Sequence, residues 1–67
     1  SHLDQSSPLR NAVYALSPKY KDVILLRFYF DLSNDEIARQ LGIQTASVRS
    51  RLFRAKQKLS QFMDRED

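Results

Sequence analysis

The sequence predicts an all-α protein: a small four-helix domain of winged-helix-like type, with a helix-turn-helix and no wing. Three observations lead to this prediction. Apolar residues recur at helical spacing along most of the chain, three separate helix-start signals occur, and Gly42, the only glycine, stands between two helical segments. A chain of 67 residues without cysteine fits one compact domain that has no disulfide bonds.

The first helix is predicted from Pro8 to about Leu16. Ser7 is placed as its N-cap, and proline suits the first helical position because its missing N–H would have no partner there. The expected core face consists of Leu9, Ala12, Val13 and Leu16.

The second helix, expected from Pro18 to about Tyr29 or Phe30, is unusually apolar. Ser17 and Pro18 repeat the start signal of the first helix. The apolar side chains of this segment cover more of the helix circumference than one core-facing stripe requires. They are Tyr20, Val23, Ile24, Leu25, Leu26, Phe28, Tyr29 and Phe30.

The third helix has the best-specified start in the sequence. Ser33 and Glu36 form an S-x-x-E capping box, and Leu32 and Ile37 are placed around it as a hydrophobic staple. Gly42 is expected to end this helix in the left-handed conformation and to open a three-residue turn of the length found in a helix-turn-helix. The predicted core face is Ile37, Ala38 and Leu41.

The last helix is predicted from Thr45 to about Met63, and its two faces differ. At about 100° per residue, one face carries a continuous apolar seam that packs on the other helices. The seam consists of Val48, Leu52, Ala55, Leu59 and Phe62. The opposite face carries Ala46, Ser50, Phe53 and Gln57, flanked by Arg49 on one side and by Ser47, Arg54 and Lys58 on the other.

Positive charge is concentrated on one segment. Residues 37–63 hold six basic side chains and no acid, although the net charge of the whole chain is only +3. Such a field suits a polyanion that meets one face of the protein. Serine and glutamine can hydrogen-bond to base edges, small residues permit close approach, and arginine can grip guanine or phosphate with two nitrogen atoms. The candidate DNA-binding residues are Thr45, Ala46, Ser47, Arg49, Ser50, Arg51, Phe53, Arg54, Gln57 and Lys58.

Phe53 is the unusual member of the polar face. An aromatic ring there is costly in water unless something covers it, and in a major groove it could lie against a thymine methyl group or a sugar. The alternatives are that it packs on the end of a neighbouring helix or is simply exposed. Its neighbours Ser50, Arg49 and Arg54 favour the DNA contact.

Other function classes have little support in the sequence. Asp35 and Glu36 are adjacent acids, but the start of a helix explains both, and no nucleophile is paired with a base. We therefore predict no enzyme activity. The single histidine, His2, has no companions that could share a metal, so no metal or cofactor is predicted. The longest apolar stretch, residues 23–30, is interrupted by Arg27 and is far shorter than the roughly 20 residues that cross a bilayer.

Several strings along the chain together match a known pattern. They are Leu16-Ser17-Pro18, the stretch from Leu26 to Ser33, Glu36-Ile37-Ala38, Leu41-Gly42-Ile43, and Ser47-Val48-Arg49-Ser50-Arg51-Leu52-Phe53-Arg54-Ala55. These strings resemble region 4 of bacterial sigma factors, above all the extracytoplasmic-function group, and the likeness covers about residues 9–62. It implies a region 4 domain over residues 8–63, with a linker or cloning remnant over 1–7 and an acidic tail over 64–67.

The resemblance implies a part of a transcription initiation factor that reads the −35 promoter element while docked on core RNA polymerase in the bacterial cytoplasm. The positions that match the family's DNA-contacting residues are Arg49, Ser50, Phe53 and Arg54. Two protein partners are also implied, the flap of the polymerase β subunit and an anti-sigma protein. The candidate residues for either contact are Tyr20, Ile24, Phe28 and Tyr29. We expect the chain to be a C-terminal fragment of such a factor, monomeric by itself and unable to open a promoter alone.

Two positions depart from the family's pattern. Gln44 stands where the family often has a serine N-cap, so the cap is expected to shift to Thr45. Ala46 stands where glycine is common. These departures affect the start of the last helix and the first contact with a base.

Two alternatives remain open on the sequence. One is the output domain of a response-regulator-type activator, which shares the Leu-Ser-Pro start and the Ser-Asn-x-Glu-Ile-Ala string and would dimerise through its last helix. The other is a sigma-like interaction module that has lost DNA reading and serves as a protein decoy or an anti-sigma ligand. The basic set on the last helix argues against a decoy, because a pure protein ligand needs no phosphate grip.

Overall fold

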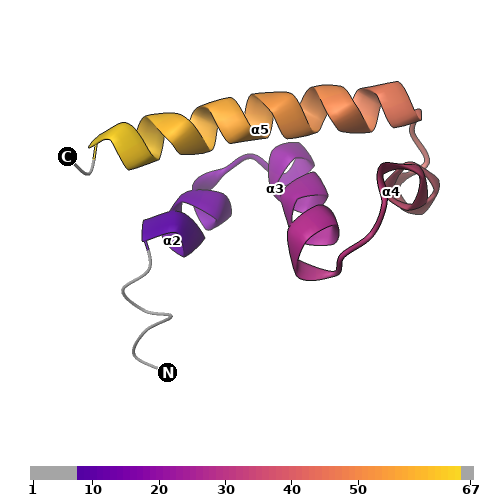
Figure 1. Cartoon of the computed structure of the whole chain (residues 1–67), viewed down its shortest axis with the longest axis horizontal. Coiled ribbons are helices and arrows are strands. Elements are labelled where there is room, and N and C mark those ends of the chain that lie inside the picture. Colours follow the sequence, from indigo (N-terminus) through magenta and orange to yellow (C-terminus); the bar gives the residue numbers. More distant parts are fainter. Residues whose placement is uncertain (1–7, 66–67) are drawn as a thin grey trace.

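The computed structural model describes residues 8–65, and it describes side chains over residues 8–61. Over these residues the chain is all-helical, which confirms the predicted fold class. The elements are α2 (Pro8–Ala15), α3 (Pro18–Ile24), a π-helical turn η1 (Leu25–Tyr29), α4 (Asn34–Leu41) and α5 (Thr45–Arg65). Figure 1 shows α2, α3 and α4 lying in order along one side of the long α5, which packs against all three.

The core lies between α5 and the three shorter helices. Val23 of α3, Ile37 of α4 and Val48 of α5 are completely buried. Because these three residues come from three different helices, one shared cluster joins the helices. Burial of a side chain of this size contributes about 1.5–3 kcal/mol relative to its exposed state. The cluster also contains Val13, Leu16, Tyr20, Ile24, Ala38, Leu52 and Ala55.

The first helix, α2, ends at Ala15, close to the predicted end. The Leu16 N–H donates to the Val13 carbonyl at 3.1 Å, a tighter loop than an α-helical bond closes. Val13 and Leu16 are buried as predicted, whereas Leu9, expected on the core face, is exposed because it lies in the first turn at the edge of a groove. Ser7, the predicted N-cap, lies outside the described residues.

The second helix has its expected length, but its last turn is π-helical. In η1 the Phe30 N–H donates to the Leu25 carbonyl five residues back, at 3.0 Å. The chain then turns away through Asp31, whose φ of 59° is left-handed, and the Leu32 N–H donates to the Leu26 carbonyl at 3.0 Å. A wider turn of this kind shifts the following side chains around the helix. The exposed large hydrophobic side chains of this segment are Phe28, Tyr29 and Phe30.

The helices α4 and α5 form the predicted helix-turn-helix. The capping box is complete, because the Ser33 N–H donates to Glu36 Oε1 at 2.8 Å and the Glu36 N–H donates to Ser33 Oγ at 3.1 Å. Gly42 ends α4 at φ 70° and ψ 36°, in the left-handed region that glycine adopts without strain. The Ile43 N–H donates to the Ala38 carbonyl at 3.0 Å, which pairs one of the last carbonyls of the helix.

The helix α5 begins at Thr45, as predicted, but its N-cap differs from the predicted one. The cap was expected at Thr45, but Gln44 precedes the helix, and its backbone carbonyl accepts from the N–H groups of Ser47 and Val48. Thr45 instead donates from its hydroxyl to Asp35 Oδ1 at 2.9 Å, which links α5 to the first turn of α4. At its other end, α5 extends two residues past the predicted end, into the expected tail.

Candidate nucleic-acid interface

The last helix has the two faces that its sequence predicts. Val48, Leu52 and Ala55 are buried against the other helices. The buried seam fixes the orientation of the helix, so its opposite face stays open to solvent. The exposed face consists of Ala46, Ser50, Phe53 and Gln57.

Phe53 is 64% exposed on this face. It therefore does not pack on the end of a neighbouring helix, which removes one of the alternatives for its role. Its neighbours three and four residues away on the helix surface are Arg49, Ser50, Lys56 and Gln57. The ring thus lies in a polar and basic setting, uncovered by the domain itself.

One flank of the exposed face borders a hollow of about 270 Å³ between α3 and α5. Three basic side chains and two serine hydroxyls line it around one aromatic ring, without an acid. The lining residues are Lys19, Tyr20, Ser47, Ser50, Arg51 and Arg54. Lys58 reaches the same ring, with its Nζ 5.6 Å from the Tyr20 ring centre, and Lys19 Nζ lies 5.1 Å from that centre. This flank therefore gathers four cations from two helices.

The opposite flank of α5 holds fewer cations. Arg49 is exposed there, and Lys56 Nζ lies 5.5 Å from the ring centre of Phe28. Thr45 is half-buried, and its hydroxyl is bound to Asp35. The polar group of Thr45 therefore has a structural role between the two helices of the helix-turn-helix.

Lys19 is a member of the basic flank that sequence reasoning missed. It lies far from the last helix in sequence, and it reaches that helix only because α3 packs on α5. One signal could have found it. Lys19 lies in the first turn of α3, where a positive charge interacts unfavourably with the helix dipole. A lysine at this position therefore suggests a role other than helix stability.

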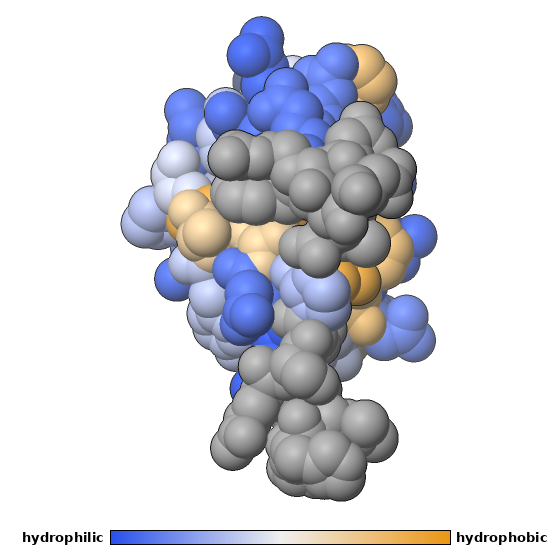
Figure 2. Space-filling model, turned by 90° about the vertical axis from the view of Figure 1, so that its left-hand side faces the viewer, coloured by the Kyte–Doolittle hydropathy of each residue, from blue (hydrophilic) through white to orange (hydrophobic). Residues whose placement is uncertain are grey.

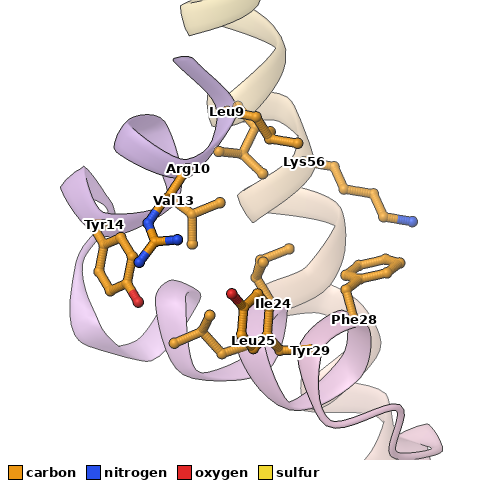
Figure 3. A pocket seen from close by; sticks show the side chains of 10 residues that line it. Leu9, Arg10, Val13, Tyr14, Ile24, Leu25, Phe28, Tyr29 and Lys56 are labelled. Atoms are coloured by element: carbon orange, nitrogen blue, oxygen red, sulfur yellow. The ribbon is translucent and has the colours of Figure 1, made fainter. Parts of the chain in front are cut away.

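A second surface lies on the Lys56 side of α5. An apolar groove of about 480 Å³ runs between α2, η1 and α5, and Figure 3 shows its side chains converging from these elements. Figure 2, which views the molecule from the α2 side, shows a band of hydrophobic residues between hydrophilic ones. The groove is lined by Leu9, Arg10, Val13, Tyr14, Ile24, Leu25, Phe28, Tyr29, Lys56 and Leu59.

The four residues predicted to bind a protein partner fall into two groups. Tyr20, only 9% exposed, and Ile24 belong mainly to the core, although Ile24 also lines the apolar groove. Phe28 and Tyr29 are 58% and 72% exposed. Phe30, outside the predicted set, is also exposed and meets Tyr29 edge-on, with the ring centres 6.4 Å apart. The apolar surface therefore lies at the C-terminal end of the second helix.

One carboxyl near the helix-turn-helix has a shifted pKa. The backbone N–H of Ser33, followed by its hydroxyl, lowers the pKa of Glu36 below its ordinary value of 4.5, because both stabilise the carboxylate of the capping box. The nearby charge of Arg39 acts in the same direction. This shift belongs to the start of α4 and has a structural cause.

The described part of the chain contains neither a membrane-spanning helix nor a metal-binding group of side chains. No helix in this part of the chain is both long and apolar enough to cross a membrane. Over residues 8–61, whose side chains are described, no group of three or more His, Cys, Asp or Glu side chains is arranged to hold a metal ion.

Comparison with known families separates the remaining readings of this geometry. The family model for Sigma-70, region 4, matches residues 6–59, most of the chain. This chain belongs to the sigma-70 region 4 family. The match confirms the resemblance of the sequence strings, and it favours a sigma factor domain over the response-regulator alternative.

Sigma factors are also the relatives that the chain matches along its length. It is similar to the RNA polymerase sigma factor SigV of Bacillus subtilis (strain 168), with 36% identity over 94% of this chain and 38% of that protein. It is similar to the RNA polymerase sigma-E factor of Streptomyces antibioticus, with 33% identity over 98% of this chain and 36% of that protein. The region 4 chain thus spans well under half the length of these relatives. No solved structure matches it significantly.

Proposed function

We propose that this region 4 domain binds the −35 element of promoter DNA through the outward face of α5, as part of a sigma factor docked on core RNA polymerase in the bacterial cytoplasm. One observation carries the proposal. A face of small, hydroxyl and amide side chains, flanked by arginines, is held outward by a buried seam and directly follows a helix-turn-helix turn. Helix-turn-helix proteins place a helix of this kind in the major groove.

The chemistry of each side chain suggests its role in this complex. Ser50 and Gln57 can exchange hydrogen bonds with base edges, and Arg49 and Arg54 can each donate two hydrogen bonds to guanine or phosphate. Phe53 would lie against a thymine methyl group or a sugar, which would remove its exposed ring from water. Close approach at the helix start and contacts to the DNA backbone are assigned to Ala46, Ser47, Arg51 and Lys58.

The apolar groove is proposed as the protein-binding surface, with Phe28 and Tyr29 at its exposed edge. Large aromatic side chains next to an apolar groove are typical of surfaces that bind another protein. The partners we propose are the flap of the polymerase β subunit during transcription and an anti-sigma protein during inhibition. The groove lies on the Lys56 side of α5 and the basic hollow on the Arg54 side, so DNA and a protein could be bound together.

The protein decoy is the second candidate function, and the apolar groove is the observation that favours it. The two functions differ in how DNA affinity depends on salt. We expect the chain to bind duplex DNA with a logarithmic affinity that falls steeply as salt rises, because several phosphate contacts release counterions. Absence of measurable binding even at low salt would reject DNA reading and support the decoy.

A further inference from the structure

We infer that the hollow between α3 and α5 is a seat for one phosphate of the DNA backbone, and that Lys19 positions this phosphate from outside the recognition helix. The inference rests on the proposed DNA binding and adds to it a residue of α3 and the ligand that this residue takes. It follows from the lining of the hollow, the fixed position of one aromatic ring, and the place of the hollow beside the outward face.

The charge of the hollow points to an anionic ligand. Lys19, Arg51 and Arg54 contribute its cations, and the lining includes no acid. Among residues 8–61, whose side chains the structure describes, none of these three side chains forms an ion pair with a carboxylate. Ser47 and Ser50 add hydroxyl groups that can donate hydrogen bonds to phosphate oxygens. Cationic and hydroxyl donors around a single hollow are the groups that phosphate contacts use.

Tyr20 holds two of the lysine side chains at this point. Its ring is packed in the core, so its position is fixed, and its remaining exposed edge faces the hollow. The Nζ atoms of Lys19 and Lys58 both lie close to this ring, which attracts cations to its face. Two ammonium groups held near one ring repel each other, and a bound anion would relieve that repulsion.

The position of the hollow favours a DNA phosphate over a free anion. Ser50 and Arg54 border both the hollow and the outward face of α5, so a duplex read by that face brings its backbone to the hollow. Contacts to the phosphates that border a groove fix the register and orientation of a helix without reading sequence. Lys19 would then set the position of α5 in the groove through α3.

The test compares Lys19→Ala with Lys21→Ala. Lys21 lies on the same helix, but its Nζ is 5.7 Å from the ring centre of Tyr14, a residue of α2. Both variants therefore lose one positive charge, but only Lys19→Ala loses it from the hollow. Binding of the chain to a short duplex of random sequence is measured over a range of salt. Lys19→Ala is expected to lower the slope of log affinity against log salt by about one. Lys21→Ala should leave the slope close to wild type, and Lys19→Arg should retain it.

Each outcome either supports or rejects the hollow as a seat for a DNA phosphate. Equal slopes for the two alanine variants, when the wild type binds DNA, would overturn the seat and leave the proposed function standing. Failure of the wild type to bind DNA would overturn both.

Thermal melting shows whether each variant is folded, and Lys19→Gln replaces Lys19→Ala if that variant melts early. The last experiment is a titration of the chain with inorganic phosphate alone. Tight phosphate binding that is lost in Lys19→Ala, while the salt slope of DNA binding stays unchanged in that variant, would assign the hollow to a free anion and overturn the DNA phosphate.

Discussion

Arg54 and Lys58 are four residues apart on the same flank of α5, yet their surroundings differ. Arg54 borders the outward face and the hollow, whereas Lys58 lies over the Tyr20 ring, toward α3. A side chain at the outward face can reach base edges, while one drawn toward the domain meets the DNA backbone at the rim of the groove. The two side chains should therefore contribute to DNA binding in different ways.

Arg49→Ala and Arg54→Ala are expected to weaken binding to the cognate element by about 1–3 kcal/mol and to relax the preference at one base. Lys58→Ala should weaken binding to all sequences alike and lower the salt slope by about one, because it removes a phosphate contact. Fluorescence anisotropy with cognate and scrambled duplexes measures both effects. Equal losses for all three variants on both duplexes would contradict the division into base-reading and backbone contacts.

Leu52 and Phe53 are neighbours in sequence with opposite settings, which makes them a matched pair. Leu52→Ala should destabilise the domain by about 2–5 kcal/mol, because it leaves a cavity under the seam of α5. Phe53→Ala removes an exposed ring, so it should leave the melting temperature nearly unchanged while weakening DNA binding. A melting curve of Leu52→Ala that matches wild type would mean that the seam is misplaced.

At the scale of elements, α4 was predicted almost completely, because its start and end depend on local chemistry. The capping box and Gly42 act over a few residues, and both are present as the sequence indicates. The seam of α5 was also predictable, since the periodicity of one long helix decides it. The first residue of α5, Thr45, was predicted too, but the capping residue was not, because the Thr45 hydroxyl donates to Asp35 on another helix.

The second helix shows where sequence reasoning failed. An apolar surplus around a helix does not tell which side faces the core, so the sequence did not show that Tyr20 and Ile24 are mostly buried while Phe28 and Tyr29 are exposed. The π-helical turn that leaves Phe28 and Tyr29 exposed depends on how the chain returns toward α4, which no local pattern encodes. Lys19 was missed for the same reason, since only packing brings it to α5.

The capping box of α4 predicts a dependence of stability on pH. The folded state lowers the pKa of Glu36 below its unfolded value, which is close to 4.5. Its contribution to stability is therefore complete above about pH 4.5 and is lost as the pH falls through the lower, folded pKa. Glu36→Gln should show a smaller loss of stability than wild type over that range, measured by denaturant unfolding at a series of pH values. Parallel pH profiles for the two proteins would contradict this role of Glu36.

At the scale of the whole molecule, the domain carries two surfaces of opposite character on the two sides of α5. The basic hollow is polar and the outward face is polar apart from Phe53, while the groove between α2, η1 and α5 is apolar. One helix, α5, lines both surfaces, which fits the proposed binding of DNA on one side and of a protein on the other.

Phe28→Ala and Tyr29→Ala are expected to separate the two surfaces. Both rings are exposed at the groove, so each change should reduce capture of core RNA polymerase several-fold in a pulldown and leave the DNA salt slope unchanged. Phe53→Ala is the reciprocal control, because it should weaken DNA binding and keep the polymerase contact. Wild-type capture by both groove variants would show that the apolar groove is not the docking surface.

The claim that α5 reads DNA with its outward face is tested most directly by selecting bound sites from random duplexes. Core polymerase that carries a full-length sigma factor with this domain is used for the selection, once with the wild-type domain and once with Arg54→Ala. Enrichment of one recurrent −35 element by the wild type, with preference lost at a single base in the variant, is the predicted result. The same enriched element with every preference intact in the variant, or no enriched element at all, would contradict the account.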